Sequence, residues 1–382
     1  MQEIDTQADF EAWLSKHEQD PVAFQGLDLI HFTETIVRNN WQGFLFLGCK
    51  LSEQAAGHIA MTGGYVISNQ DGALFEVHRS RLYSPLELFE GFDSNDPDGY
   101  HLTRDYQIYL QFKEQGGHRP ESIFISLMRR LHDHSITDAL QEAIAGRKIV
   151  AVMGGHGMER SAIFYRKVAC LSRKLSREGF LMVSGGGPGA MEATHLGAYF
   201  AGRPETELLA AIDEMKVRPP GSEPGKEYAD HDWLHRAWRV MQKYPIPSEA
   251  AAISHSIGIP TWLYGHEPPA PFATHIAKYF ANSVREEGLL AIADYGVIFA
   301  PGSAGTTQEI FQDATQNHYG SMGQISPMIL FGVTHWTETV PVWDLLQKVS
   351  HGRRYGELLS LTDDEEQVIS LILSYDAAAY MV

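Results

Sequence analysis

The chain of 382 residues is long enough for two or three domains, and its 44% hydrophobic and 20% charged residues exclude a disordered or low-complexity protein. Its 30 basic and 48 acidic side chains give a formal net charge of -18, which repels nucleic-acid backbones and anionic membranes over most of the surface. We therefore expect neither a nucleic acid nor a membrane as a partner, and a phosphate-bearing ligand would need a local, shielded pocket.

Two further features of the sequence point to the cytoplasm. The first residues lack the basic and then apolar start of a signal peptide, and no apolar run is as long as a membrane span. Cys49 and Cys170 lie far apart in apolar surroundings, which predicts two buried free thiols in a reducing compartment. We expect a cytoplasmic protein.

Residues 1–146 form the first predicted domain, an α/β region to which the sequence assigns no role. Apolar runs and capping residues predict its elements. The expected strands lie at 43–47 and 64–67, and the expected helices at 52–61, from 84 onward, up to 117, and over 121–145. In the last helix, His132 and His134 are two residues apart and point to different faces, which favours a solvated helix surface over a metal site. We expect no bound metal.

From residue 147 onward, short apolar runs alternate with helical patterns, which is typical of a doubly wound parallel sheet. The expected strands lie at 148–153, 180–183, 208–212, 259–264, 297–299 and 328–331. The expected helices lie at 161–177, from 190, at 274–292, at 306–317, after 341 and at 364–373. Between about 213 and 247 the alternation breaks, and we interpret this stretch as an insertion that serves as a lid or an oligomer contact. The fold class is therefore α/β, with residues 147–382 as the second domain.

Two glycine-rich segments each follow a predicted strand and open a helix: GGGPGAME at 185–192 and PGSAGTTQE at 301–309. Free backbone amides and the positive end of the helix dipole attract anions at such helix starts. If the two strands are neighbours, the two segments form one phosphate cradle, with the ribose and the base beyond it. The second segment also has an explanation without a ligand, because Thr306 and Glu309 have the spacing of a capping box.

Several better-known motifs fail on their spacing. Ser303 is not a hydrolase nucleophile, because a proline stands at the first glycine position of the G-x-S-x-G elbow. Residues 221–226 have three rather than four residues between their glycines, which excludes a P-loop, and His266 lacks the second histidine of a zinc protease. A loose dinucleotide fingerprint at 185–190, with Asp213 as its acid, keeps a nicotinamide-dependent oxidoreductase as a third-ranked alternative.

The pair of segments at 185–192 and 301–309 resembles the LONELY GUY (LOG) family, whose members are often mislabelled lysine decarboxylases. The resemblance covers about residues 147–375 and implies a Rossmann-like sheet. It also implies a phosphoribohydrolase that cleaves nucleoside 5′-monophosphates to the free base and ribose 5-phosphate, with no cofactor. The long N-terminal region makes the chain more similar to the larger bacterial nucleotide 5′-monophosphate nucleosidases than to the short cytokinin-activating members.

The resemblance assigns roles to individual residues. The family's catalytic arginine and glutamate correspond to Arg285 and Glu309. The residues expected to bind the nucleotide and its phosphate are Gly155, Gly185, Gly186, Gly187, Gly189, Met191, Glu192, Gly302, Ser303, Ala304, Gly305 and Thr306. The sequence departs from the family in two places: Ser303 replaces a glycine, and the first segment is one residue shorter and ends in Glu192. The shorter segment leaves the base specificity open.

The expected chemistry follows from the bond that is broken. Cleavage of an N-glycosidic bond builds positive charge on the ribose as the base leaves. We expect Glu309, in its ionised form, to bind ribose hydroxyls, stabilise this charge or activate water. Arg285 would position the substrate, and its alternative is a surface salt bridge with Glu286 or Glu287. A non-catalytic sensor of a nucleotide-derived ligand is the alternative function. Paired helices and apolar surface favour a homo-oligomer.

Overall fold

The computed structural model describes residues 2–16, 20–69, 72–96, 99–217, 232–264 and 267–382. The chain forms two compact units: Met1–Leu82 with Lys113–Ala143, and Tyr83–Phe112 with Ile144–Val382. The prediction that all of 1–146 forms one region is therefore wrong for Tyr83–Phe112. The physical reason is visible at Phe112, whose ring stacks on that of Phe280 at 5.9 Å. Residues 218–231 of the predicted insertion, and His266, lie outside the described residues.

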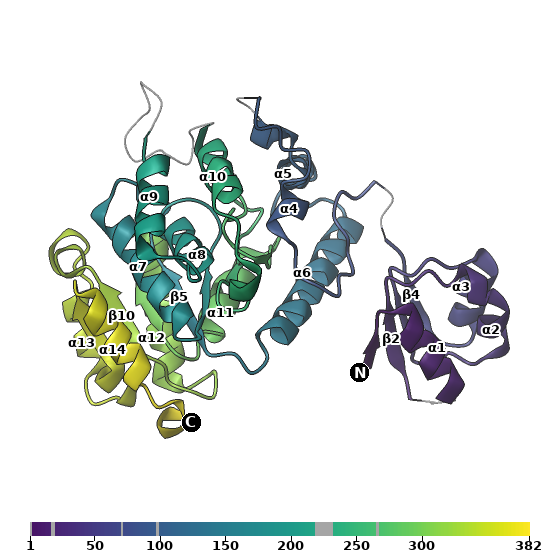
Figure 1. The fold of residues 1–382 in the computed structure, drawn as a ribbon. Helices are drawn as coiled ribbons and strands as arrows, with labels where there is room; N and C mark the ends of the chain where they lie inside the picture. Colours follow the sequence, from purple (N-terminus) through teal and green to yellow (C-terminus); the bar gives the residue numbers. More distant parts are fainter. Residues whose placement is uncertain (1, 17–19, 70–71, 97–98, 218–231, 265–266) are drawn as a thin grey trace. The chain divides into compact units, whose positions relative to one another are not determined.

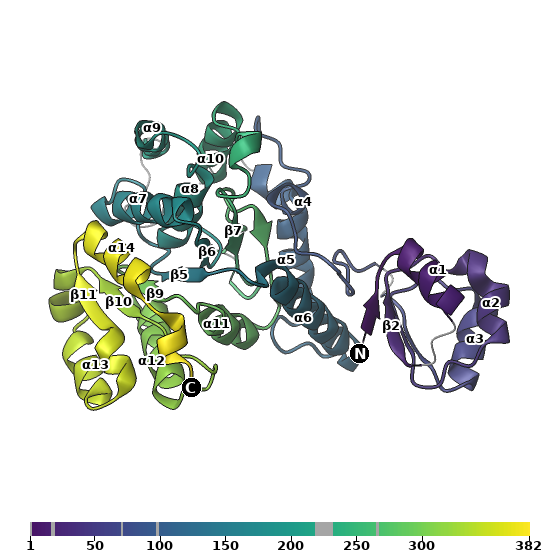
Figure 2. The same cartoon turned by 60° about the horizontal axis from the view of Figure 1, so that its bottom comes forward.

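The first unit contains a four-stranded parallel sheet in the order β1-β2-β3-β4. Its elements are β1 (Gln2–Ile4), α1 (Gln7–Lys16), β2 (Val22–Gln25), α2 (Thr33–Arg38), β3 (Leu45–Leu47), α3 (Glu53–Met61), β4 (Tyr65–Ile67) and α6 (Ile123–Ile144). Because the strand order follows the chain order, right-handed crossovers place α1, α2 and α3 on one face of the sheet (Figure 2). The strands at 43–47 and 64–67 and the helix at 52–61 are confirmed, whereas the elements before residue 40 were not predicted.

Aromatic side chains fill the space between this sheet and its helices. Ile4, Phe24 and Phe46 are in register on neighbouring strands, so that they point to the same face and are buried. The ring of Trp41 meets those of Phe24 and Phe46 edge to face at 6.0 and 5.2 Å. This packing of large rings gives the small unit a core of its own.

The histidines of α6 differ from the expectation. His132 is buried rather than solvated, whereas His134 is exposed. The ring of His132 packs edge-on against Phe75 at 5.4 Å, and burial lowers its pKa. The expected solvated surface is therefore wrong for His132, because the segment around residue 75 covers this face of the helix.

The second unit is built on a seven-stranded parallel sheet in the order β11-β10-β9-β5-β6-β7-β8. Figure 1 labels β5 and β10 of this sheet among the helices that surround it. Its elements are α4 (Pro85–Leu88), α5 (Arg104–Glu114), β5 (Ile149–Met153), α7 (Ile163–Arg177), β6 (Leu181–Ser184), α8 (Ala190–Tyr199), α9 (Glu205–Met215), α10 (Asp232–Lys243), β7 (Ser256–Gly258), β8 (His275–Ile276), α11 (Asn282–Ala291), β9 (Val297–Phe299), α12 (Ala304–Tyr319), β10 (Met328–Phe331), α13 (Trp343–Ser350), β11 (Leu359–Thr362) and α14 (Glu365–Ser374). Short 3-10 or π segments are η1 (Ile30–Phe32), η2 (Gly99–Leu102), η4 (Ser248–Ala250), η5 (His335–Thr339), η6 (Arg354–Leu358) and η7 (Ala377–Tyr380).

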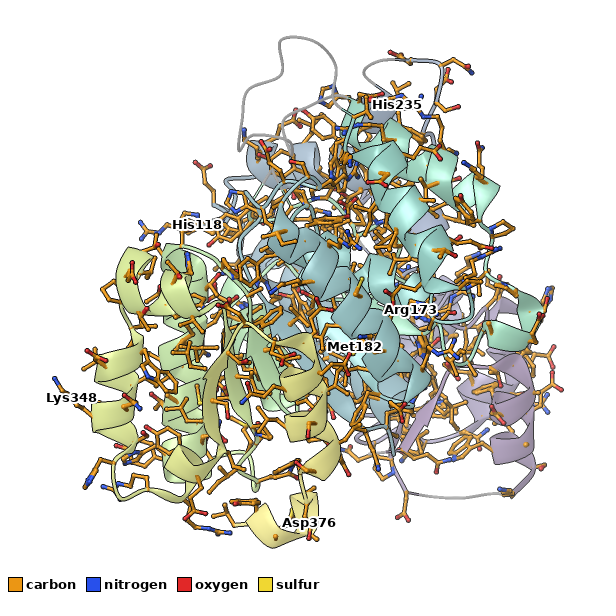
Figure 3. The ribbon with its side chains drawn as sticks, turned by 60° about the vertical axis from the view of Figure 1, so that its left-hand side comes forward. His118, Arg173, Met182, His235, Lys348 and Asp376 are labelled. Atoms are coloured by element: carbon orange, nitrogen blue, oxygen red, sulfur yellow. The ribbon has the colours of Figure 1, made fainter. Side chains whose placement is uncertain are left out.

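Helices cover both faces of this sheet, which confirms the predicted α/β, doubly wound, Rossmann-like class. α7, α8, α9 and α14 lie on one face, and α11, α12 and α13 on the other (Figure 2). Met182 on β6 lies in the interior, whereas Lys348 on α13 points into solvent (Figure 3). The chain enters the sheet at β5 in its centre and runs outward to β8 before it returns to β9. The switch point between β5 and β9 is the place where such sheets bind ligands.

Three predicted elements of the second unit are wrong. The expected strand at 208–212 is part of helix α9, whose buried residues Leu208, Ala211, Ile212 and Met215 have helical spacing. The third strand of this sheet along the chain is β7 instead, just before the expected strand at 259–264. The expected helix at 274–292 begins only at α11, because β8 occupies its first residues. β11 was not predicted.

Among the described residues, no helix is both long and apolar enough to cross a membrane. Both predicted free thiols are confirmed: Cys49 and Cys170 are buried and unbridged, and burial raises the pKa of each to about 11.

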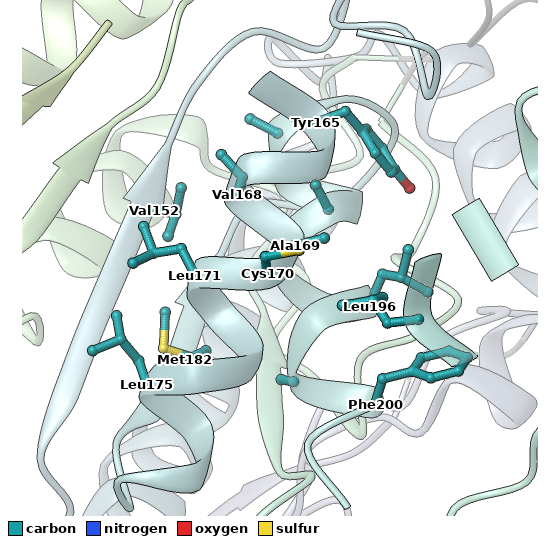
Figure 4. Packing of buried hydrophobic residues seen from close by; sticks show 14 of the residues in the cluster. Val152, Tyr165, Val168, Ala169, Cys170, Leu171, Leu175, Met182, Leu196 and Phe200 are labelled. Carbon is teal, nitrogen blue, oxygen red and sulfur yellow. The ribbon is translucent and has the colours of Figure 1, made fainter. Parts of the chain in front are cut away.

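The main core of the second unit lies between the sheet and the helix pair α7 and α8. Buried side chains of β5 and β6, such as Val152 and Met182, meet Leu171 and Leu196 from the two helices (Figure 4). The helices approach closely because Gly197 has no side chain: a Cβ there would lie 2.2 Å from the carbonyl oxygen of Ala169. This contact fixes α8, and with it the glycine-rich segment that precedes α8.

We predict that Gly197→Ala lowers the thermal unfolding midpoint of the full chain, because backbone atoms of α7 must move to admit the methyl group. The expected cost is about 1–3 kcal/mol. The matched control is Gly288→Ala in α11, where a Cβ meets nothing within 4 Å, so that alanine should stabilise its helix by up to about 1 kcal/mol. Equal midpoints for the two variants would contradict this account of the α7–α8 contact.

Candidate active site

The two predicted glycine-rich segments meet at the end of β5 and not directly with each other. β5 lies between β6 and β9 in the sheet, so the condition for a shared cradle, that the two strands are neighbours, is not met. Instead, the Gly155 peptide joins the segments. Its N–H donates to the carbonyl of Pro301 at 3.1 Å, and its own carbonyl accepts from the N–H of Ala190 at 3.3 Å. The predicted binding residue Gly155 is therefore the connection between the two loops.

The close approach of these loops requires glycine at two positions. A Cβ at Gly302 would lie 3.0 Å from the backbone nitrogen of Gly155, and one at Gly189 would lie 2.2 Å from the carbonyl oxygen of Gly155. Gly189 also has a φ of +78°, which L side chains rarely adopt. Larger residues would push the loops apart.

The first loop is a buried wall and not an open anion site. Gly185, Gly186, Gly187 and Gly189 are all buried, and Met191 is half-buried. His195 supports this wall: its Nε2 lies 3.1 Å from the carbonyl of Gly185, and its Nδ1 lies 3.1 Å from the Ser256 hydroxyl. Because a carbonyl only accepts, Nε2 carries the proton, and burial keeps the ring neutral by lowering its pKa to about 4.

Glu192 does not face a phosphate. It is fully buried, and it accepts hydrogen bonds from Nε of Arg160 and from the hydroxyl of Tyr165, each at 2.8 Å. Arg160 follows the loop after β5 and also lies over the Trp233 ring, 5.3 Å from its centroid. The expectation that Glu192 binds the phosphate is therefore wrong. A carboxylate would repel phosphate, and this one is bound to Arg160, which ties α8 to the β5 loop.

The second loop is largely exposed to solvent. Ser303, Ala304 and Gly305 are exposed, Gly302 is half-buried, and Thr306 is buried beneath them. Helix α12 begins at Ala304 with Ser303 as its N-cap, and no side chain caps it. The predicted capping box of Thr306 and Glu309 is therefore wrong, because Thr306 already lies inside the first turn. The first N–H groups of a helix have no partner within the helix, so they are available for an anion here.

His335, which was not predicted from the sequence, contacts the backbone of this loop. Its Nε2 lies 2.8 Å from the carbonyl oxygen of Gly302 and 3.2 Å from the backbone nitrogen of that residue. It belongs to the π segment η5, a rare element that often occurs at functional sites. No spacing in the sequence connects residue 335 to residue 302.

The structure brings the two residues of the predicted catalytic pair together. Nη1 of Arg285 lies 3.8 Å from Oε1 of Glu309, and both side chains are largely buried, with 8% and 13% of their surface exposed. Glu286 instead accepts hydrogen bonds from Asn282 and Gln308. The alternative that Arg285 forms a surface salt bridge is therefore wrong.

A second carboxylate, Glu267, also binds Arg285. Its Oε1 accepts from Nη2 of Arg285 at 2.8 Å, and its Oε2 accepts from the backbone N–H of Thr261 at 3.2 Å. Glu267 was not predicted, because it lies among prolines in no regular pattern. Although burial alone would lower the pKa of Arg285, the two carboxylates raise it and keep the guanidinium charged.

The environment of Glu309 brings its titration close to neutral pH. Burial raises the pKa of Glu309 to about 7, and the charges of Glu286 and Glu267 act in the same direction, whereas Arg285 opposes them. A carboxyl group that titrates near neutral pH is suited to acid or base catalysis. Glu309 was expected in its ionised form, which it therefore reaches only above about pH 7.

Two other ligand types find little support at this site. Asp213, the acid of the dinucleotide fingerprint, lies in α9 and pairs with Lys216 at 2.6 Å, and not at the end of a strand. The fingerprint is therefore incomplete. Among the residues that the structure describes, no three histidine, cysteine or carboxylate side chains are grouped to hold a metal ion.

No protein-family model and no curated protein matches the sequence. Among solved structures, the chain is similar to the molybdenum cofactor binding protein of the phototrophic bacterium Rippkaea orientalis, with 16% identity, a TM-score of 0.37, and coverage of 60% of this chain and 98% of that one. It is also similar to the molybdenum cofactor carrier protein of Chlamydomonas reinhardtii, with 12% identity, a TM-score of 0.36, and coverage of 60% and 99%. Similarity at this level assigns no ligand to the present chain.

We predict that Glu309→Gln stabilises the fold at alkaline pH. The folded pKa of about 7 lies above the ordinary 4.5, so the contribution of Glu309 to stability is complete below pH 4.5 and is lost as the pH rises through about 7. The variant should match the wild type at low pH and exceed it by about 1–3 kcal/mol at pH 8.

Thermal or urea unfolding from pH 4.5 to 8.5 measures this difference, with the exposed Glu287→Gln as the matched control. The control should show no pH-dependent difference from the wild type. The raised pKa of Glu309 would be contradicted if the stability of the variant minus that of the wild type were lower at pH 8 than at low pH.

Proposed function

We propose that this protein is a nucleoside 5′-monophosphate phosphoribohydrolase, which cleaves the N-glycosidic bond to give the free base and ribose 5-phosphate. The observation that supports it best is the placement of Glu309 beside Arg285, one turn into the helix whose N-terminus is open to an anion. One helix thus offers an anion site and a carboxyl group about a turn apart, which suits a 5′-phosphorylated ribose.

In this proposal, the phosphate binds the exposed backbone of residues 303–305 and the first N–H groups of α12. These groups are neutral dipoles, so they bind the phosphate despite the acidic net charge of the chain. The buried first loop, supported by His195, forms the wall behind the sugar. The base extends away from the phosphate.

Glu309 supplies the chemistry in its ionised form. As the bond to the base breaks, positive charge develops on the ribose ring, and a nearby carboxylate stabilises it. The same carboxylate can accept a proton from the attacking water. Water adds its oxygen to the anomeric carbon of the ribose, and the base leaves with the bonding electrons and a proton.

Arg285 holds Glu309 in place. Its guanidinium lies between Glu267 and Glu309: Nη2 donates to Glu267 at 2.8 Å, and Nη1 lies 3.8 Å from Glu309, so that the charge of the guanidinium attracts the reactive carboxylate. Burial keeps the pKa of Glu309 near neutrality against the charge of Arg285, and the charges of Glu286 and Glu267 act in the same direction as burial. The expected cytoplasmic location and the homo-oligomer stay predictions of the sequence, as does membership in the LOG family.

We predict that the purified protein releases free base from at least one nucleoside 5′-monophosphate in a panel of purine and pyrimidine nucleotides, measured by chromatography. Glu309→Gln should slow this release by about 10²–10⁴-fold, because the amide neither carries the charge nor accepts the proton. The matched control Glu287→Gln changes an exposed side chain in α11 and should keep the wild-type rate.

Absence of base release from every nucleotide would refute the proposed activity. Nucleotide binding by calorimetry without any turnover would then favour the alternative of a non-catalytic sensor. An unchanged rate in the Glu309 variant would remove this residue from the mechanism.

We predict that kcat/KM rises with pH and levels off above about 7, the pH at which Glu309 becomes ionised. The second ionisation of the substrate phosphate lies near 6 and contributes its own step. The pH profile of the residual activity of Glu309→Gln should therefore keep the step near pH 6, which comes from the substrate phosphate, and lose the step near pH 7, which comes from Glu309. A rate that falls as the pH rises from 6 to 8 would contradict a role for the ionised carboxylate.

A further inference from the structure

A row of buried charges of alternating sign connects helix α5 with the proposed catalytic pair. The row begins at Asp105 and continues through Lys278, Glu267 and Arg285 to Glu309. Its first member belongs to the segment Tyr83–Phe112, to which the sequence assigned no role, and all five residues lie in the second unit. A buried charge destabilises the protein unless it has a partner of opposite charge. It therefore matters which carboxylate pairs with which cation.

Asp105 is the anchor of this row. Its side chain is 1% exposed, and its Oδ1 lies 2.8 Å from Nζ of Lys278. The same oxygen accepts a hydrogen bond from Nε1 of Trp262 at 2.9 Å, and Oδ2 accepts from the Tyr100 hydroxyl at 3.0 Å. Three donors therefore hold the carboxylate in one position.

Lys278 and Trp262 connect Asp105 to the loop that carries Glu267. Besides Asp105, Nζ of Lys278 donates to the main-chain carbonyl of Glu267 at 3.1 Å, and it lies over the Trp262 ring at 5.4 Å. Trp262 adjoins Thr261, whose N–H binds the Glu267 carboxylate. Lys278 thus holds the backbone of Glu267 and leaves its carboxylate for Arg285.

We propose that Asp105 is a positioning residue for the Arg285–Glu309 pair: by neutralising Lys278, it keeps the Glu267 carboxylate on Arg285 and thereby sets the charge environment of Glu309. Glu309 faces Arg285 and Glu286 on α11 and Glu267 in the loop before β8. The kinetic part of this inference rests on the proposed function, whereas the effect on the titration of Glu309 does not.

The consequence of removing Asp105 follows from the pairing. The Glu267 carboxylate is already within the electrostatic influence of the Lys278 ammonium, so that without Asp105 the ammonium competes with Arg285 for this carboxylate. Glu267 then neutralises less of the Arg285 charge, and Arg285 attracts Glu309 more strongly. This attraction favours the ionised form of the Glu309 carboxyl group. A variant that also removes the Lys278 charge has no competing ammonium, and replacing both members of a buried pair is often close to neutral for stability.

The test is a double-mutant cycle in the full chain with Asp105→Asn, Lys278→Met and the double variant, with exposed Glu114→Gln on α5 as the control. Base release is measured against pH for each protein. We expect Asp105→Asn to lower kcat by about 10-fold or more and to shift the step near pH 7 downward by about half a unit or more. The double variant should recover most of the rate and the original midpoint.

A merely structural role for Asp105 would lower the unfolding midpoint in the single variant without moving the pH midpoint, and would leave the double variant no better than the single one. Either result overturns the proposal. If Asp105→Asn does not fold, a folded double variant with the wild-type pH midpoint supports the proposal, and one with an altered midpoint overturns it.

The titration of Glu309 gives a second readout that does not require activity. The stability difference between Glu309→Gln and its parent grows above about pH 4.5 and levels off near the folded pKa of Glu309. The midpoint of this levelling-off is measured in the wild-type and Asp105→Asn backgrounds. A lower midpoint in the Asp105→Asn background supports the positioning role even if no nucleotide is cleaved, and an unchanged midpoint overturns it. Failure of the proposed function alone would instead abolish base release in every protein and leave this shift in place.

Discussion

The site depends on the peptide of Gly155, which joins two loops that the sheet keeps apart. β5 separates β6 from β9, so the glycine-rich loops after these strands share no strand contact. The Gly155 N–H binds the second loop at Pro301, and its carbonyl binds the start of α8 behind the first loop. The contact is possible because Gly189 and Gly302 have no side chains. Entry of the chain at β5 thus puts the buried first loop and the exposed start of α12 at one switch point of the sheet.

The two loops and the side chains around Glu309 contribute different kinds of electrostatic interaction. The loops offer neutral dipoles, whereas Glu267, Arg285 and Glu309 are buried ionisable groups whose cost is reduced by pairing. Arg285 has two carboxylate neighbours, so it cannot fully satisfy Glu309, and burial raises the pKa of Glu309 to about 7. The fold gives up stability at this residue above neutral pH, which is common for groups kept reactive for function. The buried pair of Asp105 and Lys278 extends the same network into the segment Tyr83–Phe112.

Much of this arrangement could be predicted from local sequence, and the rest required the fold. Strands β5, β6, β9 and β10 are continuous apolar runs between turn residues, and the Arg285–Glu309 pair was expected from a family resemblance. Residues 208–212 were mistaken for a strand because a short apolar run has no distinct period until its helical neighbours are counted. Glu267, His335 and Asp105 could not be found, because their partners are distant in sequence and only the tertiary fold brings them together. The Thr306–Glu309 spacing was misleading, since α12 begins two residues before Thr306.

The most direct test of the account is a crystal structure of the Glu309→Gln variant with an intact nucleoside 5′-monophosphate. We predict that the 5′-phosphate binds the backbone amides at the start of α12, next to Ser303 and Gly305, and that the anomeric carbon of the ribose faces residue 309 and Arg285. The buried loop at 185–189 should line the space behind the sugar. A nucleotide bound elsewhere, or one with its phosphate away from α12 and its glycosidic bond far from residue 309, would contradict the central claim.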